Sequence, residues 1–113
     1  MPGVTDEQVD EALSWLGKNA RAAAKARAER LFTEEFLPAL RAKIAAECIE
    51  AGDSASAADI KAKASDAYQI ALNGYKAAVE EDEFMRWHRT RGEAIIEVWR
   101  SAQANRRAME KVQ

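Results

Sequence analysis

The sequence has few residues that interrupt or cross-link a chain. Its 113 residues include one cysteine, two prolines and five glycines. A lone cysteine excludes an internal disulfide and suits a reducing compartment, so we interpret Cys48 as a small, buried apolar residue. The scarcity of glycine and proline, with few β-branched residues, predicts an all-α protein.

Long hydrophobic runs and an excess of either charge are also lacking. No apolar run approaches the roughly 18 residues of a membrane span, and the opening MPGVTDEQVDEAL is acidic where a signal peptide is basic. The 17 basic residues nearly balance the 19 acidic ones. We therefore expect an intracellular protein without a membrane partner, in which any electrostatic partner is met by a local patch.

Alanine, in contrast, is abundant. It occurs 25 times among 113 residues and makes up almost half of the hydrophobic residues. Burial contributes roughly 25 cal/mol per Å² of apolar surface, and an alanine side chain offers little of it. We expect such a chain to need close helix contacts, self-association or a protein partner for much of its stability.

Start and stop signals predict two helices in the first half. Thr5 with Gln8 forms a capping box before a short helix that Gly17 can end. Asn19 can cap a second helix, which runs to about Ala51 and stops at the loop GDSAS.

Two further helices are predicted in the second half. Ser56 with Asp59 opens a short helix, and Asp66 with Gln69 opens a long one that meets no proline before the last residue. Long helices joined by a short connection usually turn back on each other. The expected fold is a long antiparallel helical hairpin with two short extra helices, partly a three-helix bundle, forming a single domain over residues 1–113.

At about 100° per residue, the apolar side of each long helix is predicted to switch part-way along. In the last helix one group is Tyr68, Leu72, Tyr75 and Val79, and the opposite group is His88, Ile95, Trp99, Ala102 and Met109. In the second helix the groups are Ala20, Ala24 and Leu31 against Leu37, Leu40, Ile44 and Cys48. Pro38 follows the second switch and predicts a kink.

Four consecutive acids, residues 80 to 83, point in all directions from the last helix. We therefore expect that no side of this turn packs against an apolar core. Counting back from the hairpin tip places Glu34 and Glu35 opposite them. The predicted molecule therefore has two packing zones separated by an acidic turn. Within that turn Asp82 and Glu83 are expected to pair with Arg86.

Basic residues concentrate in segments 18–31 and 84–113, which antiparallel pairing brings together. A solvated, internally neutralised surface, an acidic protein partner and nucleic acid are three interpretations of this patch. Trp87 lies off both apolar sides and is the best candidate for an exposed contact residue; the alternative is a ring that lies flat over neighbouring arginine stems. The partner-binding candidates are Trp87, Arg86, Arg89, Arg91, Lys25, Arg27, Arg30, Arg106 and Arg107.

The remaining aromatic and polar residues favour structural roles. We interpret His88 as a packed histidine and Trp15 and Trp99 as packing anchors, and we expect Arg89 to pair with Glu93. No zinc spacing, nucleophile–base pattern or calcium loop is present, so we predict no catalytic residue, cofactor, metal or small-molecule substrate.

Three stretches carry a resemblance. ALSWLGKNARAAAKARAERL, AAVEEDEFMRWHRTRGEA and EAIIEVWRSAQANRRAMEKV together resemble small helical proteins of tailed phages and prophages. The resemblance implies the cytoplasm of a bacterial host and an accessory role beside phage replication or recombination. Pro38 departs from the uninterrupted helix expected there.

We therefore hypothesise a non-enzymatic phage accessory protein that acts by binding another protein. One alternative is a nucleic-acid-binding protein that uses the basic patch. Another is a structural or assembly component of the virion, which would form ordered oligomers.

Overall fold

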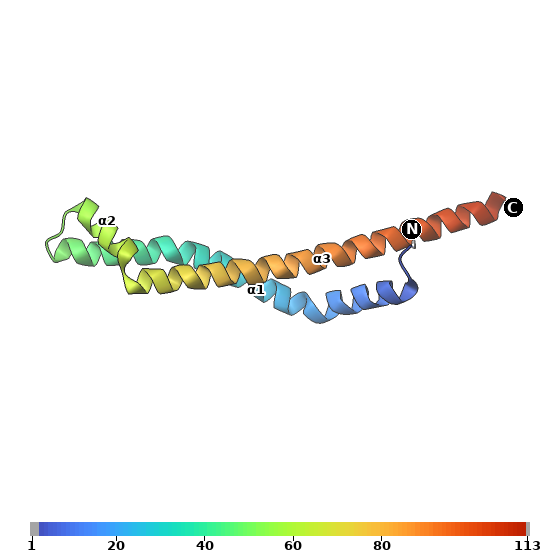
Figure 1. Cartoon of the computed structure of the whole chain (residues 1–113), viewed down its shortest axis with the longest axis horizontal. Coiled ribbons are helices and arrows are strands. Elements are labelled where there is room, and N and C mark those ends of the chain that lie inside the picture. Colours follow the sequence, from blue (N-terminus) through green and yellow to red (C-terminus); the bar gives the residue numbers. More distant parts are fainter. Residues whose placement is uncertain (1–2, 113) are drawn as a thin grey trace. The chain divides into compact units, whose positions relative to one another are not determined.

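The computed structural model describes residues 3–112, and these form three α-helices without a β-strand (Figure 1). Helix α1 spans Asp6–Glu50, α2 spans Ala55–Ala64 and α3 spans Asp66–Val112. The prediction of an all-α helical hairpin is confirmed. One of its two short extra helices is absent, because α1 continues without a break through Gly17 and through Pro38.

Both ends of α1 are capped by hydrogen bonds between residues that are close in the sequence. The backbone N–H of Thr5 donates to Gln8 Oε1 at 2.8 Å, and that of Gln8 donates to Thr5 Oγ1 at 3.1 Å, which confirms the predicted capping box. At the other end Asp53 N donates to the Cys48 carbonyl and Gly52 N to that of Ile49. This is a Schellman motif, and Gly52 has the positive φ of 109° that the motif requires.

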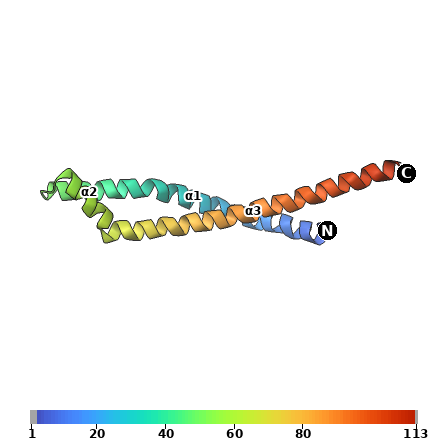
Figure 2. The ribbon, with the colours of Figure 1, turned by 45° about the horizontal axis from the view of Figure 1, so that its top comes forward.

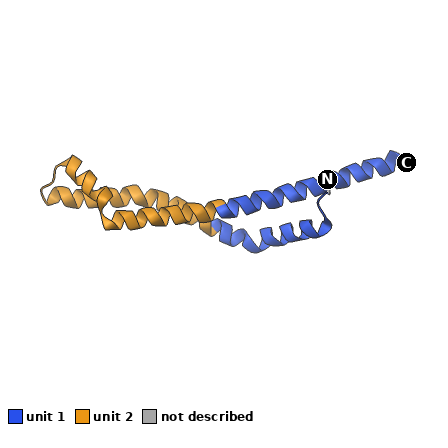
Figure 3. Cartoon of the chain, in the orientation of Figure 1, with its two compact units in different colours: residues 1–24, 84–113 blue, residues 25–83 orange. Residues whose placement is uncertain are grey.

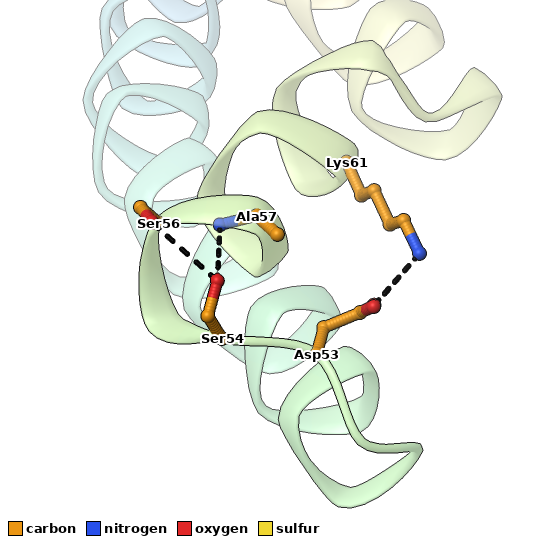
Figure 4. Close-up of polar contacts among 5 residues, drawn as sticks. All are labelled: Asp53, Ser54, Ser56, Ala57 and Lys61. Carbon is orange, nitrogen blue, oxygen red and sulfur yellow. Dashed lines mark hydrogen bonds and ion pairs between the residues drawn. The ribbon is translucent and has the colours of Figure 1, made fainter.

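Helix α2 begins with a serine cap. Ser54 Oγ accepts from the backbone N–H of Ala57 at 3.3 Å, and Lys61 Nζ donates to both carboxylate oxygens of Asp53 at 2.9 Å (Figure 4). The helix therefore opens two residues before the predicted Ser56. Ser65 ends it and caps α3, since its hydroxyl accepts from Tyr68 N at 3.2 Å.

The helices contribute to two compact units (Figure 3). Unit 1 holds the described residues up to Ala24 and from Phe84 onward, and unit 2 holds residues 25–83. Both α1 and α3 supply residues to each unit. The single domain stays a prediction.

Unit 2 is built around small residues. Within it α1 and the first part of α3 lie side by side, and α2 lies beside the end of α1 (Figure 2). Ala58 and Ala62 of α2 have no exposed surface, and Arg41 of α1 pairs with Asp59 of α2 at 3.4 Å. Three helices therefore meet here, and the third is α2, not the short first helix that the sequence predicted.

Unit 1 contains two antiparallel helical segments. The rings of Trp15 and His88 stack at 5.2 Å, and Trp99 Nε1 donates to Asp6 Oδ1 at 2.7 Å. The roles predicted for these aromatic residues as packing residues agree with these contacts. Gly92 lies against the Leu16 side chain, where an added Cβ would meet it at 3.6 Å.

The predicted switch of sides in α1 is not found. The second predicted group, Leu37, Leu40, Ile44 and Cys48, is covered as expected, but the first group is not. Ala20, Ala24 and Leu31 are exposed. Most of the buried or half-buried positions keep one alternating spacing of three and four residues: Val9, Ala12, Leu16, Asn19, Ala23, Ala26, Arg30, Thr33, Leu37, Leu40 and Ile44. The others, Trp15, Arg41, Ala45 and Cys48, lie beside this series. Five of these in a row, from Asn19 to Thr33, are small or polar residues. Over this stretch the more apolar side of α1 is therefore not the covered one.

The predicted switch of sides in α3 is also wrong, for a different reason. Its covered positions include Tyr68, Ala71, Tyr75, Ala78, Asp82, Met85, Gly92, Ile96, Trp99 and Gln103, which fit one repeat of seven. Leu72, Ala102 and Met109 are exposed. At 100° per residue, positions seven residues apart differ by about 20° around a straight helix. Over several heptads this difference adds up, so residues that face the same neighbour are wrongly assigned to different sides.

The acidic turn also differs from the expectation. Asp82 is 2% exposed and lies at a covered position of α3. Arg30 of α1 donates to Asp82 Oδ2 at 3.1 Å and to Glu83 Oε1 at 2.7 Å. Arg30 therefore meets this turn in place of Glu34 and Glu35, which are exposed. Because the acids have a cation from the facing helix, one of them can be buried.

Candidate protein-binding surface

The large apolar side chains of this chain lie mostly outside. Of the eight apolar residues that are buried in the described part, five are alanines, and only Val9, Leu37 and Met85 are larger. The exposed large apolar residues are Leu13, Leu31, Phe32, Phe36, Ile49, Ile60, Ile70, Leu72, Phe84, Trp87, Val98, Met109 and Val112. Exposed apolar residues that gather on one face mark an interaction surface, so their positions matter more than their number.

One such group follows α3 within unit 1. We call it the outer α3 face, and it consists of Phe84, Trp87, Arg91, Ala94, Val98, Met109 and Val112. Its first five members are spaced by three, four, three and four residues, so they share one side of the helix. This side points away from the covered positions Met85, Gly92 and Ile96. The helix therefore carries a second, largely apolar stripe. At its edge Phe84 contacts His88 and Arg91 lines a hollow with Trp15, whereas Trp87, Ala94 and Val98 are exposed.

Trp87 is the most exposed aromatic residue of this face, with 74% of its surface accessible. The sequence placed it off the packing side, and its exposure confirms that placement. The ring of Phe84 packs against His88, with centroids 4.5 Å apart, and His88 stacks on Trp15. Fixed aromatic rings lose little conformational entropy on binding and are typical interface anchors.

The predicted basic candidates divide between the units. Arg86, Arg89, Arg91, Arg106 and Arg107 belong to unit 1, and all five are exposed. Arg89 Nε lies 4.0 Å from Glu93 Oε1, as predicted. Lys25, Arg27 and Arg30 belong to unit 2. Five of the eight predicted cations thus belong to the same unit as Trp87. Arg86, Arg89 and Arg91 lie close to it in sequence, whereas Arg106 and Arg107 lie about 28 Å or more further along α3.

Arg30 has a structural role. Its guanidinium binds Asp82 and Glu83 at a covered position, with 26% of its side chain exposed. The hydrogen bond to Glu83, and secondarily that to Asp82, raises the pKa of Arg30 above its ordinary value. A cation held in this way is not available to a partner.

The described part of the chain contains no cluster of metal-binding side chains. Among residues 3–112, no three or more His, Cys, Asp and Glu side chains are grouped so that they could hold a metal ion. His88 is half-buried between Trp15 and Phe84, as a packed residue. Cys48 is half-buried rather than fully buried.

The sequence prediction named Trp87 and Arg91 but missed the rest of the outer α3 face. Met109 was assigned to a packing side, and Phe84 and Val98 to none. A signal was present: positions 84, 87, 91, 94 and 98 repeat the spacing of a coiled-coil seam. A second, weaker face on α1 was missed in the same way, and it holds Phe32 and Phe36.

No helix in the described part of the chain is both long and apolar enough to cross a membrane. Comparison with known proteins gives no identity: the chain matches no protein-family model, no curated protein and no solved structure.

Proposed function

We propose that this chain is a non-enzymatic protein-binding hairpin, and that it binds a helix of another protein along the outer α3 face. The observation that carries the proposal is the second apolar stripe of α3, with Phe84, Trp87 and Val98 each at least half exposed. A stripe with spacings of three and four residues fits an amphipathic helix better than an extended peptide.

The composition of the face supports a specific partner. Trp87 offers a large aromatic anchor, and removal of apolar surface from water contributes roughly 25 cal/mol per Å². Arg91 lies within the stripe and Arg89 beside it, both exposed. These cations favour acidic residues on the partner helix and oppose basic ones, so charge adds selectivity to an apolar contact.

The setting of this activity rests on the resemblance alone. We propose an accessory protein of a phage or prophage that acts in the bacterial cytoplasm, beside replication or recombination. Assembly of a virion is the alternative role for the same protein-binding surface. Nucleic-acid binding is favoured by one observation, the seven exposed arginines of unit 1.

The proposal is tested by affinity capture from bacterial lysate with the full chain as bait. The test variant is Trp87→Ser with Val98→Ser, and the matched control is Ile70→Ser, which removes an equally exposed residue of unit 2. Capture is compared by quantitative mass spectrometry after nuclease treatment.

We expect proteins that are enriched by the wild type and by the control and lost with the test variant. Capture that is equal for all three baits contradicts the assignment of the outer α3 face. Capture that disappears on nuclease treatment, together with gel shifts of DNA that weaken steeply with salt, supports nucleic-acid binding instead.

A further inference from the structure

A second exposed face lies on α1 within unit 2, and it is centred on two phenylalanines. The rings of Phe32 and Phe36 are stacked with centroids 5.8 Å apart, and they are 65% and 41% exposed. With Leu31, Glu35 and Ala39 they line a shallow hollow on the helix surface. We call this surface the Phe36 face.

Neither neighbouring helix covers this face. Arg41 marks the side of α1 that meets α2, and Arg30 marks the side that meets α3. At about 100° per residue, Phe36 lies roughly 140° around the helix from Arg41 and roughly 120° from Arg30. The Phe36 face is therefore open in unit 2.

Charges of alternating sign flank the phenylalanine. Glu29 precedes Phe36 by seven residues and Lys43 follows it by seven; Lys25 precedes it by eleven and Glu47 follows it by eleven. Seven and eleven residues are close to two and three helical turns, so all four side chains share the side of Phe36. All are exposed, and none makes an ion pair within residues 3–112.

We propose that the Phe36 face binds the same face of a second copy of this chain, with the two α1 helices antiparallel about a twofold axis at Phe36. Under that symmetry, a residue before Phe36 meets the residue equally far after it in the other copy. Phe36 then packs on its counterpart, Glu29 meets Lys43, and Lys25 meets Glu47, each pair occurring twice.

Two features favour this occupant. The sign pattern is self-complementary only in the antiparallel arrangement, because a parallel pair in register would place Glu29 on Glu29 and Lys43 on Lys43. The apolar part also extends beyond the axis, since Phe32, four residues before Phe36, meets Leu40, four residues after it, in the other copy. This inference concerns unit 2 and does not depend on the outer α3 face.

The test is light scattering of the full chain across a wide concentration range. The variants are Glu29→Lys, Lys43→Glu and the double exchange, and the control is Glu34→Lys, which makes the same charge change on another side of α1. Circular dichroism checks that each variant keeps its helices. We expect a dimer in which each single exchange raises the dimer Kd about tenfold or more, while the double exchange restores it and the control leaves it unchanged.

A second measurement fixes the axis. Phe36→Cys in a Cys48→Ala background should form a covalent dimer on mild oxidation, whereas Ile70→Cys in that background should not. The proposal is overturned by a monomer at all concentrations, by a dimer that ignores the charge exchanges, or by a double exchange that restores nothing. A dimer lost in Trp87→Ser but kept in Glu29→Lys also overturns it, because the second copy would then occupy the outer α3 face.

Discussion

Arg30 of α1 and Asp82 of α3 are joined by a hydrogen-bonded ion pair of 3.1 Å, at positions where both helices carry covered side chains. Glu83 accepts from the same guanidinium nitrogen at 2.7 Å. An apolar residue at either position would continue the packing of the helices. The pair therefore sets which residues face each other, since a shift of one helix by a turn would leave a buried carboxylate without its cation.

Removal of Arg30 alone should destabilise the protein. Arg30→Met leaves Asp82 buried opposite a methionine, and we expect the thermal midpoint to fall by roughly 10 °C. Arg30→Met combined with Asp82→Leu replaces the whole pair with apolar side chains and should recover most of that loss. Thermal unfolding at one fixed protein concentration measures both. A double variant no more stable than the single one contradicts this role of the pair.

The continuity of α1 at Gly17 makes a second prediction. Glycine inside a helix is less stable than alanine by about 0.5–1 kcal/mol, and nothing lies within 4 Å of a Cβ at this position. Gly17→Ala should therefore raise the free energy of unfolding by about that amount in urea titrations.

The matched control is Gly52→Ala, because Gly52 has a positive φ. That change should lower the free energy of unfolding by roughly 1 kcal/mol. If Gly17→Ala is destabilising as well, the chain leaves the helix at Gly17, as the sequence analysis predicted.

The bond between Lys61 and Asp53 gives a pH dependence. The hydrogen bond and the charge of Asp53 raise the pKa of Lys61 above its ordinary value of 10.5. Because the folded pKa is the higher one, the stabilisation is complete below the unfolded pKa and is lost as the pH rises through the folded pKa.

We therefore compare the thermal midpoints of the wild type and Lys61→Met as the pH is raised. The wild type should be more stable by a few degrees at about pH 8, and the gap should close once lysine is deprotonated. A gap that persists in strong alkali would show that Lys61 acts through the packing of its stem, not through its charge.

Local signals in the sequence predict much of this fold. The capping box of Thr5 and Gln8, the loop at Gly52 and the long unbroken last helix need only neighbouring residues, and all three are confirmed. Gly17 misled the prediction because glycine ends helices often, whereas here its neighbours on both sides favour helix strongly enough to continue it.

The packing side was harder to predict. Asn19, Arg30, Thr33 and Asp82 occupy covered positions, so the inner stripe is partly polar, while the outer stripes hold Phe32, Phe36 and Trp87. A search for the most apolar side therefore mixes exposed residues, such as Leu31 and Leu72, with covered ones, such as Leu37. The contacts of Arg30 with Asp82 and Glu83 show which side of each helix is covered. They join residues that are separated by 52 and 53 positions in the sequence, so local patterns do not predict them.

Whether the outer α3 face is open in the free chain is measured most directly by acrylamide quenching of Trp87. The double variant Trp15→Phe with Trp99→Phe keeps Trp87 as the only tryptophan of the chain. In the dilute chain we expect quenching close to that of free indole, because 74% of the Trp87 surface is accessible. A shielded Trp87 with blue-shifted emission at the lowest concentrations would place this stripe inside the fold and contradict the proposed binding surface.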